Sequence, residues 1–402
     1  MRFLTSGESH GKCLVGILEG MVANMDISIS EINKELERRQ RGYGRGKRME
    51  IEKDKVEIIS GIRNGKTTGG PIGIIIKNKD WQNWKEIMDI EKGHGRENFI
   101  PRPGHADLPG FIKYKYTGLR NVIERSSARE TAMRVAIGNI CKQFLKDFNI
   151  NIFSRVIQVG KVKDKSTWDE VKRNYALIEK SEVRNFIKEK EIIKEIEKAR
   201  KNGDTIGGIF EIIIEGVPPG LGSYVQWDRR LDAKISFYLM SIPAVKGINI
   251  GIGFEGIEKF GSQFHDEIYY DESKKIYRKT NNAGGIEGGI TNGENIIIRC
   301  ALKPIPTLKK PLNSVNIKTL KEEISIYERS DICVVFPASV IGENILSFLI
   351  ADEILNKFGG DTIEDVKTNY NFYLKSISKY WSNKKWKKIL FWLDLWEQVK
   401  HL

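Results

Sequence analysis

The chain has 402 residues, of which 40% are hydrophobic and 30% are charged, and its formal net charge is +13 at pH 7. This composition is ordinary for a soluble globular protein with a large core. It argues against a membrane-spanning protein, because no apolar run reaches the ~18–20 residues that cross a bilayer. The first residues also lack the apolar stretch of a secretory signal. The four cysteines are widely scattered and predict neither a disulfide framework nor a metal site. We therefore expect a cytoplasmic protein without a bound metal ion.

Short runs rich in isoleucine and valine predict β-strands. They cover Val56–Ser60, Ile72–Lys77, Ile152–Val159, Gly208–Val217, Ile248–Phe254 and Glu294–Leu302. Apolar side chains at three- and four-residue spacing predict helices. These cover Ser28–Arg39, Ala128–Phe148, Val183–Lys201, Val225–Met240 and Ile341–Phe358. Because strands and helices are mixed without regular alternation, we expect one large α+β unit that ends near residue 377, rather than a Rossmann fold or a TIM barrel.

The arginines gather near small residues, whereas many lysines alternate with glutamates as on a solvated helix face. One group lies in or beside a glycine-rich run, and the other lies in or near a pair of serines. These arginines are Arg38, Arg39, Arg41, Arg45, Arg48, Arg125, Arg129 and Arg134. Because a guanidinium group offers a planar set of donors that fits carboxylate and phosphate, the pattern predicts a discrete pocket for a small anion.

The glycine-rich run RQRGYGRGKR, at 39–48, alternates glycine with cations, so its backbone can wrap around an anion. Arginine- and glycine-rich segments also bind nucleic acids. Those segments are usually long, whereas this one is short and lies between a predicted helix and a predicted strand, which favours the anion pocket. The nearby SGIRNGKT, at 60–67, has serine where a P-loop requires glycine, so we expect a turn there.

Two of the five histidines lie in turns that small residues flank. His10 lies in TSGESHG. His105 lies in PRPGHAD, where two prolines fix the backbone around Arg102 and where Asp107 is near enough to orient the imidazole. Because histidine titrates near neutral pH, both are candidates for proton transfer. A histidine that only holds its own loop together is the alternative in each case.

The segment ERSSARETA, at 124–132, predicts the start of a helix, with Ser127 and Glu130 as a capping box. Arg125 and Arg129 are four residues apart, so we expect both on one side of the helix start. Free N–H groups and the helix dipole favour a phosphate at such a place. An ordinary capped amphipathic helix is the alternative. Two glycines at 359–360 predict the end of the last helix.

Taken in order, nine segments resemble the chorismate synthase family. They are GESHG at Gly7–Gly11, QRGYGRGKRM at Gln40–Met49, GKTTGGPI at Gly65–Ile72, RPGHADL at Arg102–Leu108, ERSSARETAMR at Glu124–Arg134, SIPAVKG at Ser241–Gly247, NNAGGIEGGITNGE at Asn281–Glu294, KPIPT at Lys303–Thr307 and ERSD at Glu328–Asp331. Several motifs in the correct order are far more specific than any one of them. The resemblance covers nearly all of the chain up to about residue 377.

The resemblance implies a fold in which helices lie between two sheets, and usually a homotetramer. It also implies the conversion of 5-enolpyruvylshikimate 3-phosphate to chorismate, a 1,4-anti elimination of phosphate without net redox change. In this family reduced flavin mononucleotide (FMN) lends electron density and accepts the departing hydrogen at N5. NADPH or a separate flavin reductase would keep the flavin reduced. The substrate carries a phosphate and two carboxylates, which agrees with the arginine groups.

Individual roles follow from the same resemblance. The catalytic residues would be His10, which manages protonation of the reduced flavin, His105, near the departing phosphate or the flavin, and Asp331, which assists proton removal at N5. Substrate contacts would come from Ser9, Arg45, Arg48, Arg102, Ser127, Arg129 and Arg329. Cofactor contacts would come from Arg125, Ser126, Ser127, Pro243, Ala244, Gly288, Lys303, Pro304, Ile305, Pro306, Thr307 and Arg329, with Arg39 and Arg45 at positions associated with a nicotinamide dinucleotide phosphate. We expect Arg48 and Arg129 each to contribute about 1.5–3 kcal/mol to ester binding, as charged hydrogen bonds do.

Two stretches, Glu91–Phe99 and Val183–Lys201, depart from the family and look like surface variation. Residues 378–402 lie beyond the usual family end and form a basic, tryptophan-rich extension. Its spacing predicts an amphipathic helix that packs on this or a neighbouring subunit, although helices on anionic membranes have a similar pattern. Because no catalytic motif lies in the extension, its removal should leave the chemistry intact.

Two other classes of protein remain as alternatives. A basic nucleic-acid-binding protein would account for the net charge, but not for the two histidine loops or for KPIPT. A flavin-dependent oxidoreductase would share the cofactor and differ in its net hydride transfer. The sequence therefore favours an enzyme with a small-molecule substrate and with neither a nucleic acid nor a membrane as partner.

Overall fold

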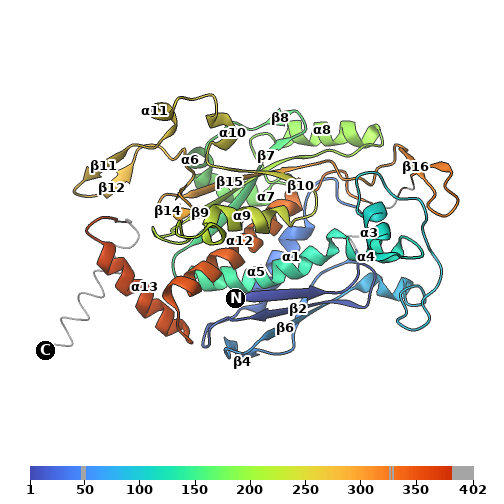
Figure 1. Cartoon of the computed structure of the whole chain (residues 1–402), viewed down its shortest axis with the longest axis horizontal. Helices are drawn as coiled ribbons and strands as arrows, with labels where there is room; N and C mark the ends of the chain where they lie inside the picture. The colour runs from blue at the N-terminus through green and yellow to red at the C-terminus, as the bar shows by residue number, and fades with distance from the viewer. Residues whose placement is uncertain (47–50, 326, 328–329, 383–402) are drawn as a thin grey trace.

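The computed structural model describes residues 1–46, 51–325, 327 and 330–382. Arg48, Arg329 and residues 383–402 lie outside this part of the chain, and with them the predicted amphipathic helix of the extension. The described residues form two larger antiparallel sheets with long helices between them (Figure 1). The predicted α+β sandwich is therefore confirmed.

The first sheet comes from the N-terminal part of the chain. Its four strands stand in the order β1-β2-β6-β3 and cover Arg2–Ser6, Cys13–Glu19, Ile72–Lys77 and Val56–Ile58. Side chains alternate between the two faces of a strand. Accordingly Leu14 and Leu18 of β2 pair with Ile76 and Ile72 of β6, and all of them are fully buried against the helices.

The second sheet has five strands in the order β10-β15-β9-β7-β8, which cover Val245–Ile250, Ile296–Leu302, Gly208–Glu215, Asn151–Val159 and Val162–Lys163. Ile212 and Ile214 of β9 face the helix layer and belong to the main core. Ile213 points the other way and packs with Trp168 and Ile178, from the short outer helices α6 (Trp168–Val171) and α7 (Tyr175–Lys180). Both faces of this sheet are therefore covered.

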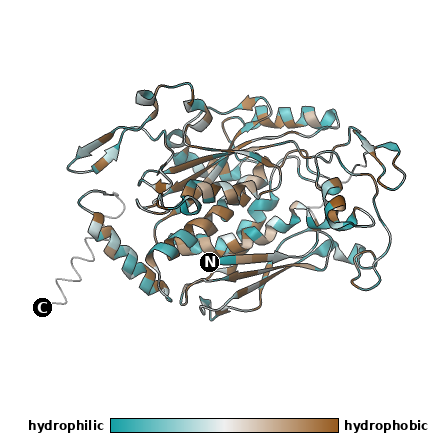
Figure 2. Cartoon of the chain, viewed as in Figure 1, coloured by the Kyte–Doolittle hydropathy of each residue, from teal (hydrophilic) through white to brown (hydrophobic). Residues whose placement is uncertain are grey.

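Three long helices fill the space between the sheets: α1 (Ile29–Gln40), α5 (Thr131–Lys146) and α12 (Val335–Phe358). The apolar colouring in Figure 2 is strongest along the central α12, whereas α1 and the outer α13 (Ile363–Ile377) carry many hydrophilic residues. Gly138 lets α5 approach α12 closely, because a Cβ there would lie 2.2 Å from a backbone oxygen of α12. Helix α12 is long and apolar enough to cross a membrane, but 94% of its apolar stretch is buried inside the fold, so it is a core helix.

The remaining elements connect these layers or lie outside them. The helical ones are η1 (Lys79–Asn83), α3 (Asp107–Tyr114), α4 (Arg120–Arg125), η2 (Ala128–Glu130), η3 (Lys172–Asn174), α8 (Glu189–Lys201), η4 (Trp227–Arg229), α9 (Leu231–Met240), α10 (Gly253–Gly256) and α11 (Gly261–Phe264). The strands pair as β4 (Ile62–Arg63) with β5 (Lys66–Thr67), β11 (Ile268–Asp271) with β12 (Lys275–Arg278), β13 (Ile286–Glu287) with β14 (Ile290–Thr291), and β16 (Asn313–Val315) with β17 (Glu322–Ile324).

Every predicted strand and helix is present, with some shifted boundaries. Strand β10 ends at Ile250, because the glycines that follow it have left-handed φ values and turn the chain. Helix α8 begins only at Glu189, since Arg184 has a φ of 52° that no helix can contain. The predicted stop after Phe358 is confirmed by Gly359, whose φ is 64°.

The predicted capping box at Ser127 and Glu130 is wrong. Ser127 Oγ accepts the N–H of Arg129 at 3.3 Å and caps the 3-10 turn η2 instead. The Glu130 carboxylate bonds to Arg134 of the next helical turn and to Thr5 of β1. Glu130 therefore ties α5 to the first sheet rather than closing its own helix end.

The predicted pair of cations on one side of this helix start is also wrong. Helix α4 ends at Arg125, and the turn η2 separates it from α5. Arg125 is exposed and donates to the carbonyl oxygens of Thr5 and Gly7, whereas Arg129 is buried. The two guanidinium groups therefore lie in different environments.

Candidate active site

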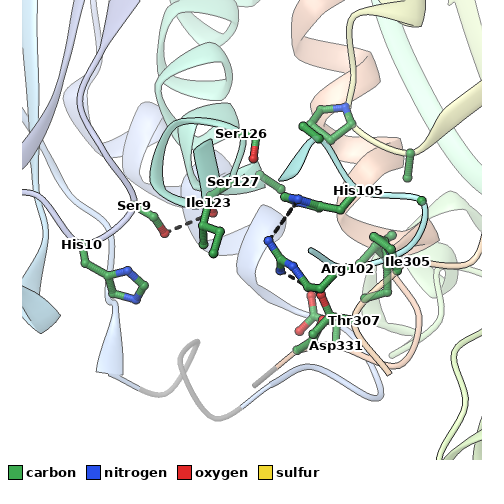
Figure 3. Close-up of a pocket in the computed structure, with 18 of the residues that line it drawn as sticks. Ser9, His10, Arg102, His105, Ile123, Ser126, Ser127, Ile305, Thr307 and Asp331 are labelled. Carbon is green, nitrogen blue, oxygen red and sulfur yellow. Dashed lines mark hydrogen bonds between the residues drawn. The ribbon is translucent and has the colours of Figure 1, made fainter. Parts of the chain in front are cut away.

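A cavity of about 480 Å³ lies at one end of the helix layer, where loops from both sheets meet (Figure 3). A second hollow of about 230 Å³ shares Ser127, Ala244 and Asp331 with it, among other residues. Helices α5 and α12 both begin here, since Ala128 before α5 and Val334 before α12 line both spaces. The free N–H groups and positive dipole ends of helix N-termini favour an anion in this position.

His10 lies in the turn between β1 and β2 and lines the cavity. Its Nδ1 is 3.0 Å from each carboxylate oxygen of Glu124, and its backbone N–H donates to the same group at 2.8 Å. The indole ring of Trp84 stacks on the imidazole at 3.9 Å, and Nε2 is 3.9 Å from Asp80. Burial would raise the pKa of Glu124, but the hydrogen bonds and charge of His10, with the charge of Arg120, hold that pKa below its ordinary value. Glu124 is therefore ionised at neutral pH.

His105 is held in the same way by Asp107, as the sequence predicts. Nδ1 of His105 is 2.6 Å from Oδ1 of Asp107. The carboxylate also accepts Nε and Nη2 of Arg102 at 2.8 and 3.1 Å, and Nη1 of Arg102 donates to Thr307 Oγ1 at 3.1 Å. Burial would raise the pKa of Asp107, but the hydrogen bonds from His105 and Arg102 outweigh it and hold that pKa well below its usual range. One buried carboxylate thus organises a histidine and an arginine of the cavity wall.

Acid should reveal the ionised state of Asp107. A carboxyl group whose pKa is depressed by folding stabilises the fold above its unfolded pKa of about 3.9, and this stabilisation is lost as the pH falls toward the folded value. Asp107→Asn removes that proton uptake. We expect the unfolding free energy of the variant, measured with urea, to be lower than wild type at pH 7 and to fall less steeply below about pH 5. Parallel curves for the two proteins would contradict the depressed pKa.

Asp331 closes the glycine-rich loop onto the cavity. Its Oδ2 accepts Nη1 of Arg45 at 2.6 Å, and its Oδ1 accepts the backbone N–H of Gly46 at 2.6 Å. Arg45 and Asp331 are 286 residues apart in the sequence. The predicted loop that wraps around an anion therefore folds against the cavity wall.

A cluster of buried arginines lies behind that loop. Arg39 donates to Ala128 O and Thr131 Oγ1, and Arg129 donates to Asp54 at 2.7 Å and to Asn78. Burial lowers the pKa of Arg39 to about 10; Asp54 opposes this shift, and the positive charge of Arg129 adds to it. An anion bound in the second hollow, which both arginines line, would offset this repulsion.

The structure brings most of the expected site residues to these two spaces. Those that line at least one of them are Ser9, His10, Arg39, Arg45, Arg102, His105, Ser126, Ser127, Arg129, Pro243, Ala244, Lys303, Ile305, Pro306, Thr307 and Asp331. Arg125, Pro304 and Gly288 line neither space, and Gly288 lies in the turn between β13 and β14. Arg48 and Arg329 lie outside the described residues.

Several residues that support the site were not predicted from the sequence. Asp80 and Trp84 line the cavity beside His10, and Glu124 and Asp54 hold a histidine and an arginine from behind. Glu124 lies in the segment that was predicted to bind an anion through its arginines. A carboxylate partner for a cationic side chain could therefore have been predicted there. Nothing in the spacing of Asp54, Asp80 and Trp84 points to the cavity.

The walls fit the flavin mononucleotide that the resemblance implies. Pro243, Ala244 and Ile305 present apolar surface, and nearby hydroxyl groups of Ser126 and Thr307 can bind a polar tail. Ala244 has a left-handed φ of 72°, which a residue with a Cβ adopts only at a cost in free energy. The volume is within the roughly 300–1,000 Å³ usual for ligand sites.

The fold and the cavity define an α+β enzyme that binds an anionic small molecule beside two histidines. A family model for chorismate synthase matches residues 1–355, and the chain belongs to the chorismate synthase family. Chorismate synthase from Alkaliphilus metalliredigens is 53% identical over 379 residues, which are 92% of this chain and 99% of that protein. The enzyme from Aquifex aeolicus is 50% identical over 394 residues, with 94% and 99% covered. A crystal structure of chorismate synthase, 43% identical, matches with a TM-score of 0.77 and covers 94% of this chain and 98% of its own.

The activity follows from this membership. The chain converts 5-enolpyruvylshikimate 3-phosphate to chorismate and phosphate in the shikimate pathway, with reduced FMN as cofactor. The two alternatives, a nucleic-acid-binding protein and a net oxidoreductase, are therefore set aside.

Proposed function

We propose that the cavity and the adjoining second hollow bind the phosphate and the two carboxylates of the ester through Arg102 on the first and Arg45 and Arg129 on the second, with Ser9 and Ser127 beside them. His10 and His105 hold and move the protons of the reaction. One observation carries this proposal: both histidines, from distant parts of the chain, line a single cavity, and each is bonded through Nδ1 to a carboxylate that the surrounding charges keep ionised. Reduced FMN, which Pro243, Ala244 and Ile305 would hold, would supply the electron density that the elimination needs.

Asp331 first serves to hold the glycine-rich loop. Because its two oxygens accept the N–H groups of Arg45 and Gly46, it fixes a proposed substrate-binding arginine at the wall of the second hollow. Its part in proton removal at the flavin stays a prediction. Arg48 and Arg329 also stay predicted substrate contacts, and Arg125, Pro304 and Gly288 stay predicted cofactor contacts.

The source of reducing equivalents is tested by an anaerobic assay. Either the chain reduces its own FMN with NADPH, at the positions of Arg39 and Arg45, or a separate flavin reductase does so. Chorismate formation with NADPH and FMN alone would establish the first route. Activity only with chemically reduced FMN would establish the second.

We also propose that residues 1–377 form one catalytic domain and that 378–402 are an extension of it. The start of the extension contacts the β11–β12 hairpin, where Ile276 N–H donates to Tyr380 O at 2.9 Å, and Trp381 packs against Gly293. Helix α13, which leads into it, lies at the opposite end of the molecule from α3 and α4 (Figure 1).

We place the protein in the cytoplasm, where thiols stay reduced, because all four cysteines are free.

The segment between β9 and β12 supports the proposed homotetramer. It exposes large aromatic side chains, including Trp227 at 75% and Phe237 at 72%. Exposed aromatic groups of this kind are enriched in protein–protein interfaces.

The double variant Trp227→Asp/Phe237→Asp should therefore dissociate the assembly into smaller species, because it places charges in apolar contacts. Light scattering with size-exclusion chromatography measures the mass. Phe372→Asp, at an equally exposed position on α13 (76%), is the matched control and should leave the mass unchanged. A tetramer that survives the double substitution would place the interface elsewhere.

A further inference from the structure

The side chain of Glu124 is fully buried behind His10 and contacts that residue at two points. It accepts both the backbone N–H and the imidazole Nδ1 of the same residue, at 2.8 and 3.0 Å. Arg120, one helical turn earlier on α4, donates to it at 3.3 Å. Glu124 thus fixes His10 at two points and is itself held by a cation.

This contact decides which nitrogen of His10 carries a proton. An ionised carboxylate has acceptors only, so the Nδ1 that faces it must be the N–H donor. In the neutral imidazole the other nitrogen, Nε2, is then without a proton. Either nitrogen can be protonated in a free histidine, so the choice is imposed by the carboxylate.

The tryptophan stacked on the imidazole hinders rotation of the ring. Trp84 lies on it with an interplanar angle of 19°, and Arg96 and Arg120 lie over the ring of that tryptophan at 4.7 and 5.3 Å. The nearest carboxylate to Nε2 is Asp80 at 3.9 Å, which is too long for a hydrogen bond. Within the described part of the chain, Nε2 is therefore left available to a ligand in the cavity.

We propose that Glu124 is a positioning residue of the reaction, which holds the Nδ1 proton of His10 and so restricts proton exchange to Nε2. The neutral ring takes up one proton at Nε2 from the bound ligand, becomes an imidazolium between Glu124 and Asp80, and returns that proton to the ligand. Glu124 stays ionised throughout. This inference rests on the proposed role of His10.

The tautomer can be observed directly in the FMN-bound enzyme. The chain has five histidines, so labelling them with ¹⁵N gives few signals, and His10→Gln assigns the one of interest. With the imidazole neutral, we expect a protonated, pyrrole-type Nδ1 and a bare, pyridine-type Nε2 in wild type. In Glu124→Gln this preference should be lost, because the amide can donate to Nδ1. A wild-type ring protonated on Nε2, or an unchanged tautomer in the variant, would overturn the proposal.

A matched carboxylate separates positioning from folding. Glu130 lies on the same segment and is also buried, but it bonds to Arg134 and Thr5 rather than to a histidine. Glu130→Gln should therefore leave the tautomer of His10 as it is in wild type. If it shifts the tautomer as much as Glu124→Gln does, the effect is a general loosening of the segment and the proposal fails.

Kinetics in two backgrounds give the second test. Glu124→Gln should lower kcat by about 10²–10⁴-fold, the usual cost of a mispositioned histidine, and change KM by less than about threefold. In the His10→Ala background the same substitution should have no further effect. An equal loss in both backgrounds would show that Glu124 acts on structure alone. Near-wild-type turnover of His10→Ala itself would instead refute the proposed role of His10, so the two failures are distinguishable.

Discussion

Replacing His10 by alanine should lower kcat about 10²–10⁴-fold while reduced FMN stays bound, and His105→Ala should do the same. Each imidazole faces the cavity and is oriented by its own ionised carboxylate, which is the arrangement of a general acid or base. Among the hydrogen bonds of the described residues, neither imidazole bonds to the apolar wall of Pro243, Ala244 and Ile305, so the flavin site should persist. Turnover under anaerobic conditions and flavin retained on ultrafiltration measure the two effects separately.

His94→Ala is the control for these variants. His94 is exposed, and its Nδ1 contacts only the nearby carbonyl of Lys92 among the hydrogen bonds of the described residues. It should turn over like wild type. If His10→Ala or His105→Ala also keeps wild-type turnover, that histidine is not a proton-transfer residue.

Arg129→Ala should lower the free energy of unfolding by about 3–5 kcal/mol, because it leaves a buried carboxylate without its partner. The side chain of Arg129 is 2% exposed and that of Asp54 is fully buried, with 2.7 Å between Nη1 and Oδ2. Arg39 lies 3.8 Å from the same carboxylate and cannot replace the lost hydrogen bonds. Urea unfolding at pH 7 measures this loss.

The expected loss in ester binding, about tenfold or more, comes in addition. Arg41→Ala is the matched control: this arginine is 61% exposed and pairs with Glu37 at the surface, so its removal should cost less than about 1 kcal/mol. A stable Arg129→Ala protein with weakened binding would mean that Arg129 serves the ligand only and not the fold.

Local patterns predicted the layers of this fold but not the contacts of its charged groups. The isoleucine-rich strands were found because their apolar residues are continuous. Strand β1 was not predicted from the sequence. Its apolar Leu4 points outward and is 71% exposed, so the strand lacks a regular alternation of apolar and polar residues. Helix α13 was missed although Ile363, Val366, Tyr370 and Leu374 recur at helical spacing and are buried.

For the site, sequence distance set the limit. Asp107 could be matched with His105 because the two are neighbours on one rigid loop. The Glu124 contact of His10 spans 114 residues and the Asp331 contact of Arg45 spans 286, so only the folded chain brings these groups together. Arg125 and Arg129 were expected to act as a pair because of their four-residue spacing, although Ser127 marks a helix start between them.

Product analysis under anaerobic conditions tests the central claim most directly. The protein is incubated with the phosphorylated ester and with reduced FMN at a small fraction of the ester concentration. The amounts of chorismate and phosphate formed are then measured. Our account predicts equal amounts of both products and many turnovers for each reduced flavin, because the elimination has no net redox change. Product formation that stops after one equivalent of reduced flavin would indicate net hydride transfer and contradict the account.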